Sequence, residues 1–289
     1  MFTVPADFVD SICLISAALG IQHLTRFAEL SGKFRQGGEE YYNKSQHIVF
    51  QFANGQHKST ERIPYRSMEP ESMLGPVVDS KYTLRKHMIF EDLKTNEEID
   101  YLQFERIQAS NGLLALTLNS SNICGKWLDL FSSWVNVSRL CISDCHNDSA
   151  SKLLSHFVKN RQLSSLQLYE KNVLKENFDL CIGLLKQPQF DSLTVPYDAT
   201  VISVFVKMPR AKYSHWKRVV VLGCVGESLL SKFGMPDVCP REEKNFITNY
   251  YPCAALLVKY ENSLGSKGMP VDKFMEAVEQ TIFFKCFRS

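Results

Sequence analysis

The sequence predicts an α/β fold: a solenoid of about five strand–helix units that follows a small N-terminal helical module. A six-residue pattern, apolar-x-x-apolar-x-apolar, begins at residues 137, 163, 190 and 216, so its copies are 26, 27 and 26 residues apart. Apolar residues at helical spacing lie between the copies, which predicts a helix after each strand. A unit of this length cannot bury its apolar face alone, so neighbouring units are expected to stack into one core. Two further apolar stripes in the first forty residues predict the helical module.

The strands of the solenoid are expected at 137–142, 163–168, 190–195 and 216–221. An earlier copy at 113–118 lies 24 residues before the first of these and makes five strands. The pattern and its period resemble those of leucine-rich repeats, in which short strands line a concave surface and helices return the chain. The resemblance implies that residues alternating with the core positions face outward and bind a protein partner. We expect this surface to comprise Thr117, Asn119, Arg139, Ser143, Ser165, Gln167, Tyr169, Ser192, Thr194 and Arg218.

The segments between the strands are expected to return as helices. The stripe at 150–158 is the clearest, because its apolar residues fall at i, i+3, i+4, i+7 and i+8 and Asn147-Asp-Ser before it supplies N-cap chemistry. Stripes at 128–134, 174–185 and 229–233 serve the neighbouring strands in the same way. The β-branched run at 201–206 fits either a helix or a strand.

The remaining chain gives the domain boundaries. Residues 1–41 form the helical module, 42–106 a connecting segment, and 107–289 the repeat domain. Within the connecting segment, the run 48–52 and the Asn54-Gly55 turn signal predict a strand hairpin. A stripe from Val271 to Ile282 predicts a C-terminal capping helix, which the exposed end of a solenoid requires.

The N-terminal module carries the second resemblance. Val4-Pro5 is followed by Phe8, Val9 and Ile12, then by a stripe of Leu24, Phe27 and Leu30, and the segment ends in Ser31-Gly-Lys-Phe34-Arg35. This order resembles the F-box, which opens on a hydrophobic–proline pair, places Ile or Leu seven residues later, and ends in Ser-x-x-Phe or Trp with a basic residue. The chain departs from that pattern at Val4, where leucine is usual, and in an interval about three residues longer around 19–21.

An F-box followed by leucine-rich repeats resembles the substrate-receptor subunits of cullin-RING ubiquitin ligases, and the first ten residues also resemble F-box-like families expanded in nematodes. The resemblance implies three partners: the ligase adaptor subunit, the cullin scaffold beyond it, and a protein substrate on the repeats. The adaptor-binding residues are then expected to be Val4, Pro5, Phe8, Val9, Ile12, Phe27, Leu30 and Phe34.

The alternative is that residues 5–34 form an amphipathic cap on the first repeat of a stand-alone leucine-rich-repeat scaffold. The two hypotheses differ in the exposure of Pro5, Phe8 and Ile12. An exposed apolar patch there favours a docking site, whereas burial against Leu113 and its neighbours favours a cap.

No residue pattern predicts catalysis, a metal site or a cofactor. None of the seven histidines has a metal-ligand spacing, and the nearest cluster, Cys141, Cys145 and His146, falls on a predicted strand and its turn. A net charge of +2 gives no reason to expect nucleic acid or membrane as a partner. Because no catalytic pattern occurs, we expect a protein that is not an enzyme. Nine scattered cysteines, and an uncharged N-terminal stretch too short to span a bilayer, lead us to expect it in the cytoplasm or nucleus.

Overall fold

The structure is a computed structural model and shows an α/β protein, which confirms the predicted class. It divides into two compact units, Met1–Leu140 and Cys141–Ser289, and the boundary falls within strand β6 (Val137–Ile142). Of the helices in the described ranges, none is long and apolar enough to cross a membrane. The described residues are 5–19, 22–65, 67, 71–72, 80–94, 99–120, 123, 125–143, 148–198, 200–201, 204, 217–222, 246–251, 256–261 and 279–286.

The first unit begins with three helices, α1 (Ala6–Leu19), α2 (Gln22–Ala28) and α3 (Lys33–Lys44). Val9, Cys13 and Leu24 form a core with Tyr41 of α3 and with Leu84 of the sheet that follows. Helices α1 and α3 approach closely at Gly37, where an added Cβ would lie 2.8 Å from Val9 Cγ1. We call these three helices the N-terminal module; its core is completed by the sheet.

The sheet of the first unit combines a hairpin with parallel strands. Strands β1 (Gln46–Ala53) and β2 (Gln56–Pro64) are antiparallel, and Asn54 and Gly55 join them with positive φ of 51° and 73°, as a tight hairpin turn requires. Strand β3 (Glu71–Ser72) pairs with the outer edge of β2. On the other side, β1 is parallel to β4 (Thr83–Glu91), which is parallel to β5 (Leu113–Asn119).

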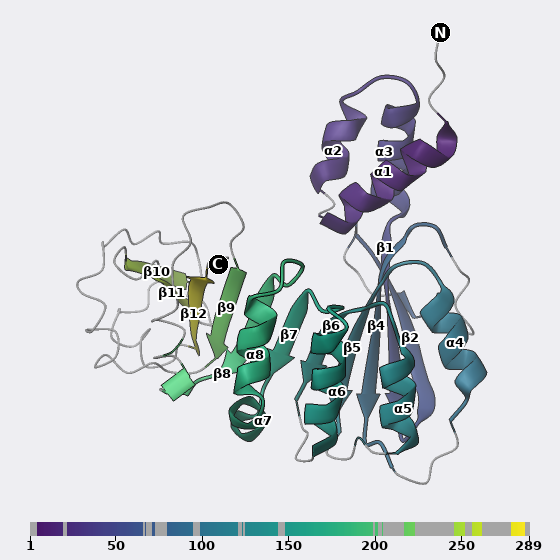
Figure 1. The fold of residues 1–289 in the computed structure, drawn as a ribbon. Helices are drawn as coiled ribbons and strands as arrows, with labels where there is room; N and C mark the ends of the chain where they lie inside the picture. The colour runs from purple at the N-terminus through teal and green to yellow at the C-terminus, as the bar shows by residue number, and fades with distance from the viewer. Residues whose placement is uncertain are drawn as a thin grey trace. The chain divides into compact units, whose positions relative to one another are not determined.

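Helices α4 (Tyr101–Ala109) and α5 (Lys126–Ser133) cover one face of this sheet (Figure 1). The ring of Phe90 on β4 lies at the centre of an aromatic cluster, with ring centroids 5.0 Å from those of Phe52 and Phe131. The cluster is fully buried and comprises Phe52, Phe90, Phe104, Trp127, Phe131 and Trp134.

The sequence pattern did not predict β4 as a repeat strand. Its burial alternates, with Leu84, Lys86, Met88 and Phe90 inward, so a lysine occupies a position where the apolar pattern expects an apolar residue. The chain between 42 and 106 is therefore more than a connecting hairpin, because β4 and α4 add a strand and a helix before β5.

Lys86 is only 1% exposed, yet its charge is satisfied. Its Nζ donates to the carbonyl oxygens of Ile107 at 2.7 Å and Gln108 at 3.0 Å, and also to that of Ser110. These carbonyls end α4, where the last turn has no intrahelical donors and the helix dipole favours a cation. The lysine therefore fixes the C-terminus of α4 to the strand beneath it.

The second unit continues with α6 (Asp148–Lys159), β7 (Ser165–Leu168), α7 (Lys171–Glu176), α8 (Phe178–Leu185), β8 (Ser192–Pro196) and β9 (Lys217–Leu222). Strands β7, β8 and β9 are parallel. Strands β12 (Glu279–Cys286), β11 (Leu256–Glu261) and β10 (Phe246–Tyr251) then extend this sheet antiparallel from β9. Strands β6 to β9 lie where the repeated pattern predicts strands.

Two sequence predictions are wrong. Leu113 was expected inward, but it is exposed, and β5 buries Leu114, Leu116 and Leu118 instead, because alternation along a strand outweighs the first position of the pattern. The capping helix was expected to include Ile282, which lies in β12. The adjacent Phe283 and Phe284 favour a strand, and β9 supplies the partner for it.

Two return segments are only partly described. In the ambiguous run at 201–206, the described residues Val201 and Val204 are helical. The predicted helix at 229–233, and residues 271–278 of the predicted cap, lie outside the described residues.

Candidate functional site

The N-terminal module carries apolar side chains both in its core and on its surface. Phe8 is 51% exposed and Leu30 50% exposed, and Pro5 is exposed as well. Ile12, Phe27 and Phe34 are half-buried, and the rings of the two phenylalanines stack with centroids 6.2 Å apart. We call Pro5, Phe8, Ile12 and Leu30 the module's apolar surface. It forms because Val9 and Cys13, one turn apart, direct one side of α1 inward, so Phe8 and Ile12 lie off that side.

One of the predicted adaptor residues is not available for docking. Val9 is buried in the module core, at 4% exposure, because it packs against Gly37 of α3. Val4 lies outside the described residues. Of the eight predicted residues, the structure therefore leaves Pro5, Phe8 and Leu30 exposed and Ile12, Phe27 and Phe34 half-exposed.

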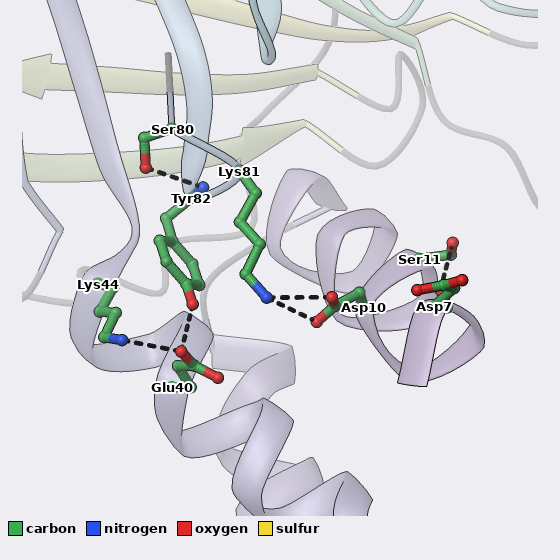
Figure 2. A network of polar contacts seen from close by, with 8 residues as sticks. All are labelled: Asp7, Asp10, Ser11, Glu40, Lys44, Ser80, Lys81 and Tyr82. Carbon is green, nitrogen blue, oxygen red and sulfur yellow. Dashed lines mark hydrogen bonds and ion pairs between the residues drawn. The ribbon is translucent and has the colours of Figure 1, made fainter. Parts of the chain in front are cut away.

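A polar network attaches the module to the strand region (Figure 2). Lys81, just before β4, pairs with Asp10 of α1 at 3.0 Å. Tyr82 donates its hydroxyl hydrogen to Glu40 of α3, which also pairs with Lys44 at 2.8 Å. These hydrogen bonds from Lys44 and Tyr82 lower the pKa of Glu40 below its usual value.

The network contributes more to orientation than to stability. Both ion pairs are largely exposed, and exposed pairs contribute only about 0–1 kcal/mol. They nevertheless act beside the contact between the rings of Tyr41 and Tyr82, whose centroids are 5.1 Å apart, because Lys44 Nζ and Lys81 Nζ each lie 5.1 Å from the centroid of the Tyr82 ring. The module's apolar surface is thus held in a set direction relative to the first unit's sheet.

The second candidate region is the face of the first unit's sheet opposite α4 and α5. The predicted residues Thr117 and Asn119 on β5 are half-buried there, and Arg139 on β6 is exposed. The structure adds residues that sequence analysis missed: His47 of β1 and Arg85 and His87 of β4. For Arg85 and His87, the signal in the sequence was the alternation along β4 between polar residues and residues that face the core. Lys86 obscured this alternation because it is polar but faces the core.

The two histidines of this face are close together. Their rings stack with centroids 6.0 Å apart, and His87 Nε2 lies 2.7 Å from Thr117 Oγ1. Burial, and then His87, Arg85 and Arg139 nearby, lower the pKa of His47 to about 4. Burial, with Arg139, also lowers the pKa of His87. Both imidazoles are therefore neutral at pH 7. The formal charges near them are those of Arg85 and Arg139.

In the second unit, the predicted binding residues divide into two groups. Ser143, Ser165 and Gln167 are half-buried and Tyr169 is exposed, with its hydroxyl donating to Gln167 Oε1 at 3.4 Å. Burial, and then Cys141, raise the pKa of Tyr169.

Ser192 and Thr194 alternate along β8 with the fully buried Leu193 and Val195, but each is itself only 8% exposed, so the predicted binding surface is not open to solvent at these two residues. They lie on β8, which pairs with a strand on both edges, and their short side chains rise little above the neighbouring backbone. Arg218 lies on β9, and its side chain is outside the described part of the structure.

The described part of the chain contains no group of three or more His, Cys, Asp or Glu side chains placed to hold a metal ion. What the two candidate regions offer is contact surface: apolar on the module and basic on the sheet face. The residues Cys145 and His146 lie outside the described ranges. The chain matches no protein-family model, and the search of curated proteins also found no match.

Proposed function

We propose that this protein is a non-catalytic substrate-recognition adaptor of a cullin-RING ubiquitin ligase. In this proposal the N-terminal module is a divergent F-box that docks on the ligase adaptor subunit. The strands that follow are leucine-rich-repeat-like units, and their open face binds a protein substrate. Such a protein would work in the cytoplasm or nucleus and would need no cofactor.

The exposure of Phe8 and Leu30 carries this proposal. A large apolar side chain on a small module gains about 1.5–3 kcal/mol when it moves from water into a contact, so a surface with two of them favours association. The same module buries Val9, Cys13 and Leu24 completely or nearly so, in a core that Leu84 of β4 completes. The exposed residues are therefore not the ones that hold the helices together.

One observation favours the alternative, a stand-alone repeat scaffold whose helices serve as a cap. Leu84 of β4 belongs to the module core, and Tyr65 and Tyr82 pack against it. The module thus covers part of the strand region as a cap does. It does so with residues other than Pro5 and Phe8, so capping and docking use different surfaces of the same helices.

The proposal is tested by pull-down of the purified chain with an adaptor–cullin subcomplex. The variants are Pro5→Ala/Phe8→Asp and, separately, Leu30→Asp. The matched control is Leu102→Asp, because Leu102 on α4 is 66% exposed and lies outside the module. Circular dichroism and a urea titration confirm that each variant is folded.

We expect stoichiometric binding by the wild type and by Leu102→Asp, and a loss of about tenfold or more in the two module variants, since truncating an interface anchor costs about 2 kcal/mol or more. A folded wild type that does not bind the subcomplex would overturn the ligase proposal and leave the scaffold. Equal losses in the control and in the module variants would show that the apolar surface is not the docking site.

A further inference from the structure

We infer that the basic face of the first unit's sheet binds an acidic segment of a partner protein, with carboxylates from that segment meeting Arg85 and Arg139. This inference rests on the proposed function, because it names the class of substrate that the repeat strands would capture. It uses the residues His47, Arg85, His87, Thr117 and Arg139, which we call the basic cluster.

The strand register places the basic cluster on one face. In the β1–β4 pairing His47 lies opposite Arg85, and in the β4–β5 pairing His87 lies opposite Ala115. The hydroxyl of Ser138, immediately before Arg139, donates to the carbonyl of Leu114 at 3.0 Å, and Arg139 lies close enough to His87 to lower its pKa.

The electrostatics of this face favour an anion. The charged or titratable groups that shift the pKa of His47 are all basic: His87, Arg85 and Arg139. Of the carboxylates on the neighbouring strands, Glu91 pairs with Lys58 at 3.4 Å and Glu61 lies on β2, beyond β1 from the arginines. In the described part of the chain Arg85 makes no ion pair. A guanidinium in this position can accept a carboxylate with two parallel hydrogen bonds.

The spacing of the two arginines suits a row of carboxylates more than one compact anion. Arg85 and Arg139 lie on β4 and β6, with β5 between them, so their backbones are about 10 Å apart. In an extended peptide, alternate side chains lie on one side and about 7 Å apart, which the long arginine side chains can bridge. A segment with acidic residues at alternate positions therefore meets both arginines.

An apolar contact accompanies the charges. Leu113, which is 45% exposed, lies opposite Arg85 in the β4–β5 pairing. An apolar side chain two positions along the peptide from an acidic one lies on the same side and would cover Leu113. The hydroxyl of Thr117 and the neutral imidazoles add hydrogen-bonding groups without adding charge.

The test uses the full chain and fluorescence polarisation with three labelled peptides. In the first peptide, two glutamates and a leucine occupy successive alternate positions with serines between them; the second replaces each glutamate by glutamine, and the third carries the same net charge on phosphoserines. The variant is Arg85→Gln/Arg139→Gln. The matched control, Arg35→Gln/Arg106→Gln, removes the same charge from exposed arginines on α3 and α4.

We expect the glutamate peptide to bind the wild type and the control alike, and the Arg85→Gln/Arg139→Gln variant about tenfold more weakly, with no binding of the glutamine peptide. No binding of the glutamate peptide, or equal loss in the control, would overturn the inference. Tighter binding of the phosphoserine peptide by about tenfold would overturn the assignment to a carboxylate-rich segment. Phe8→Asp should bind the peptide normally, so a failure of adaptor docking and a failure of this inference are distinguished.

Discussion

The two apolar clusters of the first unit are built differently. The aromatic cluster under α4 and α5 has its rings sealed from water, and it is centred on Phe90. The N-terminal module has a smaller core around Val9 and Tyr41, a polar network at its edge, and large apolar side chains left outside. The comparison teaches that apolar character alone does not say whether a residue stabilises the fold or faces a partner. An apolar residue that is fully buried stabilises the fold, whereas an apolar residue exposed beside a buried core is available to a partner.

The largest expected effect that tests this comparison is that of Phe90→Ala. The ring of Phe90 has neighbouring aromatic rings at centroid distances of 5.0–6.3 Å, so its removal leaves a cavity. We expect the free energy of unfolding, measured by urea denaturation, to fall by about 3–5 kcal/mol. Phe8→Ala should change it by no more than about 0.5 kcal/mol. Comparable losses in both variants would mean that Phe8 belongs to the core.

A smaller loss is expected for Lys86→Met, which keeps the apolar stem of the side chain but removes the ammonium group. Three carbonyl groups at the end of α4 would lose the ammonium donor, although those of Ile107 and Gln108 keep donors in Ser110 and Asn136, so we expect a loss of about 2 kcal/mol. Urea denaturation measures the loss, and hydrogen exchange should show faster opening of the last turn of α4. Lys126→Met, at an exposed position on α5, is the control. An unchanged stability would show that water replaces the ammonium group without loss.

Gly37→Ala tests the packing of the module, and Gly183→Ala on α8 is its control. The two substitutions are expected to change the free energy of unfolding in opposite directions. At Gly37 an added Cβ would lie 2.8 Å from Val9 Cγ1, and a valine in a helix has little freedom to turn its side chain away. Gly37→Ala should therefore destabilise by about 1–2 kcal/mol. At Gly183 of α8 nothing lies within 4 Å, so Gly183→Ala should stabilise by about 0.5–1 kcal/mol. Thermal unfolding of both variants measures the pair, and a stabilising Gly37→Ala would contradict the close approach of α1 and α3.

The smallest expected effect concerns the pH dependence of the basic cluster. The pKa of His47 is about 4 in the folded chain and about 6.5 when unfolded, so the unfolded chain binds the proton more readily. This contribution to stability is present above pH 6.5 and is lost as the pH falls toward 4, by about 1 kcal/mol after allowance for solvent screening. NMR titration of the imidazole resonances should place the midpoint below pH 5. In the His47→Gln variant, the loss of stability between pH 7 and 4 should be smaller than in the wild type.

Strands β5 to β9 could be predicted from the sequence, because each lies at one copy of an apolar pattern that recurs at a near-constant interval. The hairpin at Asn54 and Gly55 also follows from local chemistry, since both residues tolerate the positive φ that the turn needs. The three helices of the module lie within the segment that the apolar stripes indicated. In each of these cases, the information is carried by residues close together in the chain.

Strand β4 and the basic cluster could not be found in this way. Lys86 interrupts the apolar pattern by which β4 would have been predicted. A lysine can face the core there only because the end of α4 supplies carbonyl oxygens. His47 and His87 are forty residues apart in the chain, and only the pairing of β1 with β4 brings their rings together. The strand at Glu279–Cys286 was likewise mistaken for a helix, since its partner β9 is distant in sequence.

The sequence by itself therefore determined the α/β class, the positions of strands β5 to β9 and the apolar content of the N-terminal module. Tertiary structure decided which of those apolar side chains are buried. Val9 and Phe8 are adjacent and equally apolar, and only the packing of α1 against Gly37 places the first inside and the second in water. The physical reason is that periodicity is a local property, whereas burial and the grouping of charges depend on which distant segments meet.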